Sequence, residues 1–140
     1  MEQRLTIITL GVNNLERATE FYETKFEWSK SGSSNEFISF FTLNGIQLAL
    51  YERKELAKDA MVDHNGSGFK GFTLAYNTRS VKEVDRIIEN LKRKGVVIVK
   101  EPQKTSWGGY SSYASDMDNN LWEIAFNPFL ELNSDGNVIQ

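Results

Sequence analysis

The alternation of apolar and polar residues along the chain predicts a strand, a helix and two more strands in its first half. Residues 5–12 form an apolar, β-branched run that is typical of a strand. Asn13 and Glu16 resemble a capping box, which predicts that a helix begins there. Apolar residues then recur every three or four positions, as one buried helical face requires. They are Leu15, Ala18, Tyr22 and Phe26.

Two strands, at residues 37–43 and 46–51, follow this helix. They flank Asn44-Gly45, a dipeptide that readily supplies the positive φ angles of a tight hairpin. Residues 54–67 are polar and lack a sustained period, which predicts a linker or a mobile loop.

The second half of the chain repeats this plan. A strand is predicted at 69–76, and a helix begins at Ser80 with Glu83 and ends near Gly95. The apolar positions of this helix are Val84, Ile87, Ile88 and Leu91. Strands follow at 96–100, 110–115 and 121–126, with a loop at 102–109.

The duplication points to a binding cleft. A helix covers only one face of each sheet, so the alternating residues of the other face must line a shared interior or a cleft. A duplicated module usually places a ligand site between or inside the paired sheets.

Composition removes several classes of function. The chain has 140 residues, 40% of them hydrophobic, which suits one compact unit with a real core. It contains no cysteine and one histidine, His64, which excludes disulfides, thiolate metal sites and His-rich centres within one chain. A net charge of −3 argues against nucleic-acid and anionic-membrane partners.

The N-terminal segment does not resemble a secretory signal. Glu2 and Arg4 precede a short apolar stretch, and no apolar run is long enough to span a membrane. We therefore expect a soluble, cytoplasmic protein.

Two segments resemble signatures of the vicinal oxygen chelate superfamily, which includes glyoxalase I, extradiol dioxygenases, thiol transferases of fosfomycin resistance and bleomycin-binding proteins. One is the opening run LTIITLGVNNLERATEFY, at residues 5–22. The other combines Trp107-Gly-Gly-Tyr110 with SDMDNNLWEIA, at residues 115–125, where an aspartate-rich turn precedes a strand with tryptophan and glutamate. The resemblance covers about residues 3 to 128.

This resemblance implies an α+β fold of two paired βαβββ modules that form a curved mixed sheet around a cleft. We expect a single domain with modules at about 3–53 and 68–128, the linker between them, and a C-terminal tail at 129–140. It also implies four inward positions for a metal site, two in each module. By register these are Ile7, Ala49, Gly71 and Glu123.

Only Glu123 of these four can bind a cation, and one carboxylate does not hold a transition metal against water. We therefore expect no metal and no other cofactor. His64 could swing in from its loop, but a lone loop histidine is more often an exposed polar residue.

Strand alternation selects the same face without the family. Ile8, Leu10 and Val12 should pack against the helices, as should Trp122, Ile124 and Phe126. In the loop, Trp107 and Tyr110 are candidates for gating or stacking on a ligand. The predicted cleft residues are Ile7, Thr9, Gln47, Ala49, Tyr51, Gly71, Thr73, Trp107, Tyr110 and Glu123.

Glu123 has two interpretations. It is either a structural acceptor for a backbone amide, Gln47 or Tyr51, or a partly desolvated acid that anchors a cationic ligand or transfers protons. The second makes Glu123 the candidate catalytic residue.

The leading hypothesis is a metal-free protein that binds an unidentified small organic molecule. The first alternative is a glyoxalase-, lyase- or dioxygenase-like enzyme, either metal-independent or with a degenerate metal site. The second is an interaction module in which the protein's own side chains fill the cleft. The family resemblance also implies a homodimer.

Overall fold

The computed structural model describes residue 3 and residues 5–139, which fall into two compact units divided between Gly68 and Phe69. Glu2 and Arg4, on which the interpretation of the N-terminal segment depends, lie outside the described residues. Among the described residues, none of the helices is long and apolar enough to cross a membrane.

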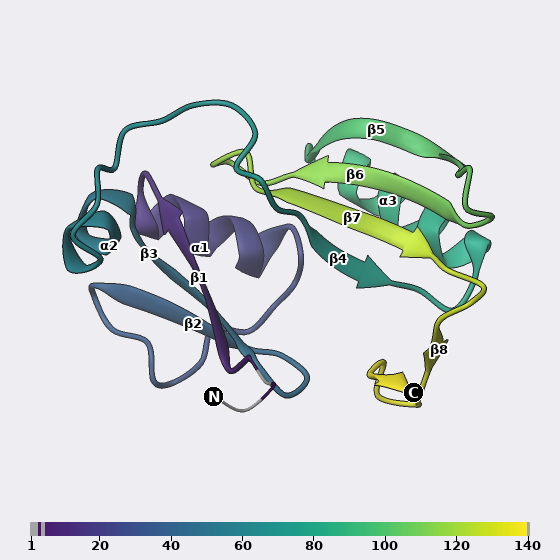
Figure 1. Cartoon of the computed structure of the whole chain (residues 1–140), viewed down its shortest axis with the longest axis horizontal. Helices are drawn as coiled ribbons and strands as arrows, with labels where there is room; N and C mark the ends of the chain where they lie inside the picture. Colours follow the sequence, from purple (N-terminus) through teal and green to yellow (C-terminus); the bar gives the residue numbers. More distant parts are fainter. Residues whose placement is uncertain (1–2, 4, 140) are drawn as a thin grey trace. The chain divides into compact units, whose positions relative to one another are not determined.

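The first unit is a sheet with a helix on one face (Figure 1). Its strands are β1 (Ile7–Val12), β2 (Ile38–Thr42) and β3 (Gln47–Glu52), in the order β1-β3-β2. β1 pairs with β3 in parallel, and β2 pairs with β3 antiparallel. The parallel pair needs a crossover connection, which α1 (Leu15–Thr24) supplies.

The predicted helix is present, but its ends differ from the prediction. The N-cap is Asn14, not Asn13, because the side chain of Asn14 accepts a hydrogen bond of 2.9 Å from the Arg17 amide. The helix ends at Thr24, so Phe26 lies beyond it. The Phe26 ring still belongs to the core, where it packs edge-to-face against Tyr22 with ring centroids 5.3 Å apart.

Two other details of the first half differ from prediction. Only Gly45 of the Asn44-Gly45 hairpin has positive φ, at 77°. The predicted linker begins with a helix, α2 (Arg53–Asp59), which buries Ala57. The short helix escaped prediction because it has too few apolar residues to show a period.

The first unit also has one strand fewer than the βαβββ plan. The residues between α1 and β2 form no regular strand, although Ser31 N donates to Phe40 O at 2.7 Å. The α+β class and the duplicated plan are otherwise as predicted.

The second unit repeats the arrangement with a four-stranded sheet. Its order is β4-β7-β6-β5, from β4 (Leu74–Asn77), β5 (Val97–Lys104), β6 (Tyr110–Ser115) and β7 (Leu121–Phe126). The first strand again pairs in parallel with the last, as in the first unit. α3 (Val81–Arg93) covers one face of this sheet, which Figure 1 shows.

β6 and β7 have the predicted bounds, whereas β4 and β5 do not. β4 starts five residues later than predicted, because Gly71 has φ +81° and interrupts the extended backbone. β5 runs on to Lys104 and includes Pro102, which an edge strand tolerates. The predicted tail forms a small hairpin of β8 (Glu131–Leu132) and β9 (Val138–Ile139).

The ends of α3 match their sequence signals. Ser80 caps the helix by accepting from the Glu83 amide at 3.2 Å. Gly95 has φ +74° and, with Val96, closes the last turn through backbone bonds to Lys92 and Leu91. Val84 and Ile88 are fully buried, so this helix contributes much of the core of the unit.

We predict that Ser80→Ala lowers the free energy of unfolding by about 1 kcal/mol, because the Glu83 amide loses its side-chain acceptor and keeps only the backbone oxygen of residue 80. Urea denaturation followed by circular dichroism measures the loss. Ser134→Ala is the control, since its hydroxyl is exposed and makes only a 3.4 Å contact with Asp135. Equal losses in the two variants would show that the cap contributes nothing.

Candidate functional site

The face of the second sheet that points away from α3 carries the candidate site. The Tyr110 hydroxyl donates to Asp85 of α3 at 2.8 Å, which identifies the helix-facing side of β6. By register, Trp122 and Ile124 of β7 share that side and are buried. Glu123 lies between them in sequence and therefore projects from the opposite face, where it is half-buried.

Charged and polar side chains form a row across the strands on this face. The register pairs Lys100 of β5 with Tyr113 of β6, and Tyr113 with Glu123 of β7. Ala75 of β4 follows as the partner of Glu123. Neighbouring strands lie about 4.8 Å apart, so the cation and the carboxylate stand on either side of the phenol.

Specific contacts hold this row in place. Lys100 Nζ donates to Ser111 Oγ at 3.0 Å and lies 5.2 Å from the centroid of the Tyr113 ring. Glu123, which pairs with Tyr113 in the strand register, and Thr73 both act on the pKa of the Tyr113 phenol. Three residues of the second unit, Lys100, Glu123 and Thr73, therefore lie around one phenol.

The surroundings of Tyr113 favour its neutral form. Burial is the main cause that raises its pKa above the ordinary value of 10, and the negative charge and hydrogen bond of Glu123 raise it further. The hydrogen bond from Thr73 acts in the opposite direction. At neutral pH Tyr113 is thus a proton donor that faces a carboxylate.

This arrangement can bind a polar molecule or move a proton. Lys100 offers a cation to an anionic group, and Glu123 offers a carboxylate to a cation or a hydrogen-bond donor. A neutral phenol beside a carboxylate is also a possible acid–base pair.

The structure brings together two of the predicted site residues in this unit, Glu123 and Thr73. Sequence reasoning missed Lys100, Ser111 and Tyr113. Alternation along 110–115 was the available signal, because it separates Tyr113 from Tyr110. The sequence alone did not fix which of the two tyrosines shares the face of Glu123.

Three predicted site residues of the second unit lie elsewhere. Tyr110 is on the α3 side of the sheet and so does not share the face of Glu123. Trp107 is 45% exposed, and its indole covers the Cα of Gly109, where a side chain would collide with the ring. Gly71 precedes β4 in an irregular segment.

The predicted residues of the first unit share one sheet face. The register pairs Ile7 with Gln47, Thr9 with Ala49, and Gly11 with Tyr51. Leu10 and Leu48, at alternate positions, are buried on the other face, as predicted. Ala49 has no exposed surface, whereas Ile7 is 43% exposed.

His64 lies in the exposed loop after α2. Its backbone oxygen accepts from Arg53 Nε at 2.8 Å, and its imidazole Nδ1 lies 3.8 Å from Asp63 Oδ1. Within the described part of the chain, no three His, Cys, Asp or Glu side chains gather closely enough to hold a metal ion.

The residues at the implied metal positions do not fit a transition metal. Ile7, Ala49 and Gly71 have no side-chain donor atom, and Glu123 is engaged with Tyr113. A divalent metal in a protein needs several nitrogen or oxygen ligands.

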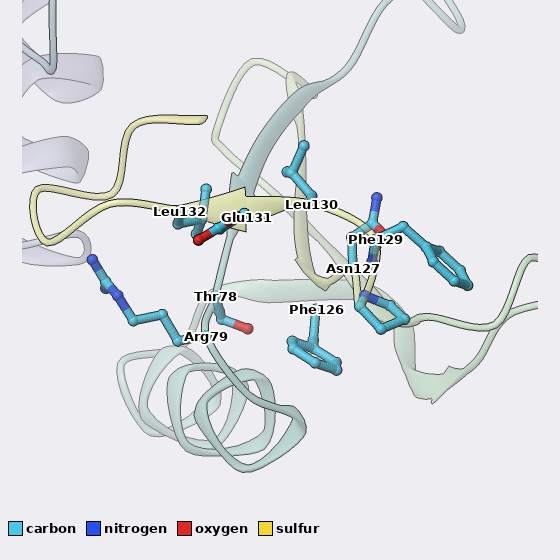
Figure 2. A pocket seen from close by; sticks show the side chains of 9 residues that line it. Thr78, Arg79, Phe126, Asn127, Phe129, Leu130, Glu131 and Leu132 are labelled. Carbon is cyan, nitrogen blue, oxygen red and sulfur yellow. Dashed lines mark hydrogen bonds between the residues drawn. The ribbon is translucent and has the colours of Figure 1, made fainter. Parts of the chain in front are cut away.

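A separate hollow of about 550 Å³ lies beyond the end of β7 (Figure 2). Its walls come from Thr78, Arg79 and residues 126–132. Arg79 Nη2 donates to the backbone oxygens of Asn133 and Ser134, at 2.9 and 2.8 Å, and so ties the C-terminal hairpin to the start of α3. None of the predicted site residues lines this hollow.

We predict that the free energy of unfolding of the wild type falls as pH rises above 10. In the Tyr113→Phe variant it should fall less. A raised pKa means that the folded protein keeps the phenol proton after unfolded chains have lost it. The stabilisation is therefore complete below pH 10 and disappears as pH rises through the folded-state pKa. Thermal unfolding between neutral and alkaline pH tests this, with Tyr51→Phe as the control. Identical pH dependence in wild type and Tyr113→Phe would contradict it.

Comparison with known proteins places this chain in a family. The Glyoxalase/Bleomycin resistance protein/Dioxygenase superfamily matches residues 4–124. Fosfomycin resistance protein FosX of Listeria monocytogenes is 31% identical over 126 residues, which cover 86% of each chain.

Solved structures agree with this match. A glyoxalase-related enzyme from Fulvimarina pelagi has 33% identity and a TM-score of 0.88, with 99% of both chains covered. The Listeria monocytogenes FosX structure has 27% identity and a TM-score of 0.69, with 92% of this chain and 97% of that chain covered. This chain therefore belongs to the glyoxalase/bleomycin resistance protein/dioxygenase superfamily.

Proposed function

We propose that this protein binds a small organic molecule, without a metal, on the face of the second unit that carries Lys100, Tyr113 and Glu123. The observation that carries the proposal is the row of cation, phenol and carboxylate across three adjacent strands. Among the described residues, Lys100 and Glu123 do not pair with each other, because Tyr113 stands between them.

The charges indicate the kind of ligand. A negative or electron-rich group of the ligand binds Lys100. A cationic or hydrogen-bond-donating group of the same molecule binds Glu123. Tyr113 adds a neutral hydroxyl and an aromatic edge between them. A dipolar molecule of small size satisfies all three side chains at once.

The absence of metal is part of the proposal and rests on the chemistry of the donor set. Three of the four implied ligand positions are Ile7, Ala49 and Gly71, whose side chains offer no ligand atom. Stoichiometric zinc, nickel or iron that copurifies with wild type and is lost in Glu123→Gln would overturn it.

The alternative is an enzyme that uses Tyr113 and Glu123 for proton transfer. The direct pairing of Tyr113 with Glu123 on neighbouring strands favours it, since a candidate acid and base must lie within reach of each other. The sequence predicted Gln47 or Tyr51 as partners of Glu123, whereas its partner within its own unit is Tyr113. The similarity to FosX makes fosfomycin the first compound to test, as ligand and as substrate.

We predict that Glu123→Gln keeps the fold but weakens ligand binding at least tenfold, equivalent to about 1.4 kcal/mol. The amide is nearly isosteric and removes only the charge and the proton acceptor. Ligand-observed NMR with fosfomycin and a panel of small zwitterions measures binding, and the same samples report turnover. Lys100→Gln should weaken the same ligands, whereas Lys58→Gln, an exposed lysine of α2, should not.

Two outcomes separate the hypotheses. A Glu123→Gln protein that melts several degrees lower yet binds normally would show that Glu123 is only a structural acceptor. Consumption of a bound compound by wild type, lost in both Glu123→Gln and Tyr113→Phe, would favour the enzyme.

We also propose that the protein is a homodimer, as the resemblance implies. Light scattering after size exclusion at micromolar concentration should give twice the 16.0 kDa chain mass. A monomer mass would overturn it.

A further inference from the structure

Lys70 links two segments that are far apart in the sequence. Its ammonium donates to the backbone oxygen of Asp118 and to the side-chain oxygen of Asn120, both at 2.8 Å. Lys70 is half-buried and Asn120 is 3% exposed. Charge-assisted hydrogen bonds in such surroundings are stronger than those between exposed groups.

The partner of Lys70 is itself rigid. Asp116 accepts from the backbone amides of Asp118 and Asn120, at 2.9 and 2.8 Å, and from the Asn120 side chain at 2.7 Å. Asn120 thus donates to Asp116 through its nitrogen and accepts from Lys70 through its oxygen. The turn between β6 and β7 therefore presents a fixed acceptor to Lys70.

The segment that Lys70 anchors leads to the candidate site. Residues 71–73 have no regular secondary structure, and the β4–β7 pairing begins only at Leu74 with Trp122. Thr73 lies two residues before Ala75, the partner of Glu123, and is close enough to Tyr113 to lower the pKa of its phenol. The described restraints on this segment are the Lys70 bonds on one side and the strand pairing on the other.

We propose that Lys70 is a positioning residue, which clamps residues 70–73 to the β6–β7 turn and thereby holds Thr73 beside Tyr113. The aspartate-rich turn then closes the β6–β7 hairpin and also positions residues 70–73 beside the ligand-binding face. The inference rests on the proposed function in taking Tyr113 as a ligand contact.

The test measures the position of Thr73 by NMR on the full chain without ligand. In wild type, nuclear Overhauser effects should join the Thr73 methyl group to the Tyr113 ring. Lys70→Met should abolish them and move the Tyr113 ring shifts to the values of Thr73→Val. The double variant should show no further change, because both substitutions break the same contact. Lys70→Arg, which keeps the charge and donors, should restore most of the wild-type signal.

Lys58→Met is the matched control, since Lys58 is an exposed lysine of the other unit. The proposal is overturned if Lys70→Met leaves the Thr73–Tyr113 signals intact, or if its effect and that of Thr73→Val simply add. If Lys70→Met does not fold, Lys70→Gln replaces it, and the same two results would overturn the proposal. Because no ligand is present, failure here is distinct from failure of the binding proposal, which the Glu123→Gln experiment tests.

Discussion

The two-residue period of β7 is the constraint on which the second unit depends. This strand lies between β4 and β6, so both of its edges are paired and its side chains have only two directions to take. Trp122 and Ile124 fill the interior beneath α3, and Glu123 must then emerge on the other side. A shift of one residue would bury the carboxylate and expose an indole, which explains why the register is so strongly fixed.

The sequence sufficed to predict the features that depend on local chemistry. The cap at Ser80, the stop at Gly95 and the bounds of β6 and β7 follow from residues within a few positions of each other. The apolar period also identified the buried face of α3. These signals are strong because one face of each element is fully removed from water.

The sequence failed where distant residues decide the outcome. The length of β5 depends on its pairing with β6, including the register shifts around Lys100. The partners of Glu123 depend on which face Tyr113 occupies, and that is set by the contact between Tyr110 and α3. Local patterns carry no information on such cross-strand pairs.

The family resemblance likewise predicted some features and not others. It identified the fold, which is a property of the strands. It did not identify Lys100, Ser111 or Tyr113, which give this face its chemistry. One fold hosts many reactions because exchanging a few such side chains leaves the packing intact.

The parallel pairing of first and last strands has a consequence for synthesis on the ribosome. In each unit the opening strand, β1 or β4, has its neighbour in the closing strand, β3 or β7. It therefore leaves the ribosome before the strand with which it pairs. Until that partner is synthesised, its edges remain unpaired while the helix forms. This order occurs twice in the chain, once in each unit, and each time over about half of its length.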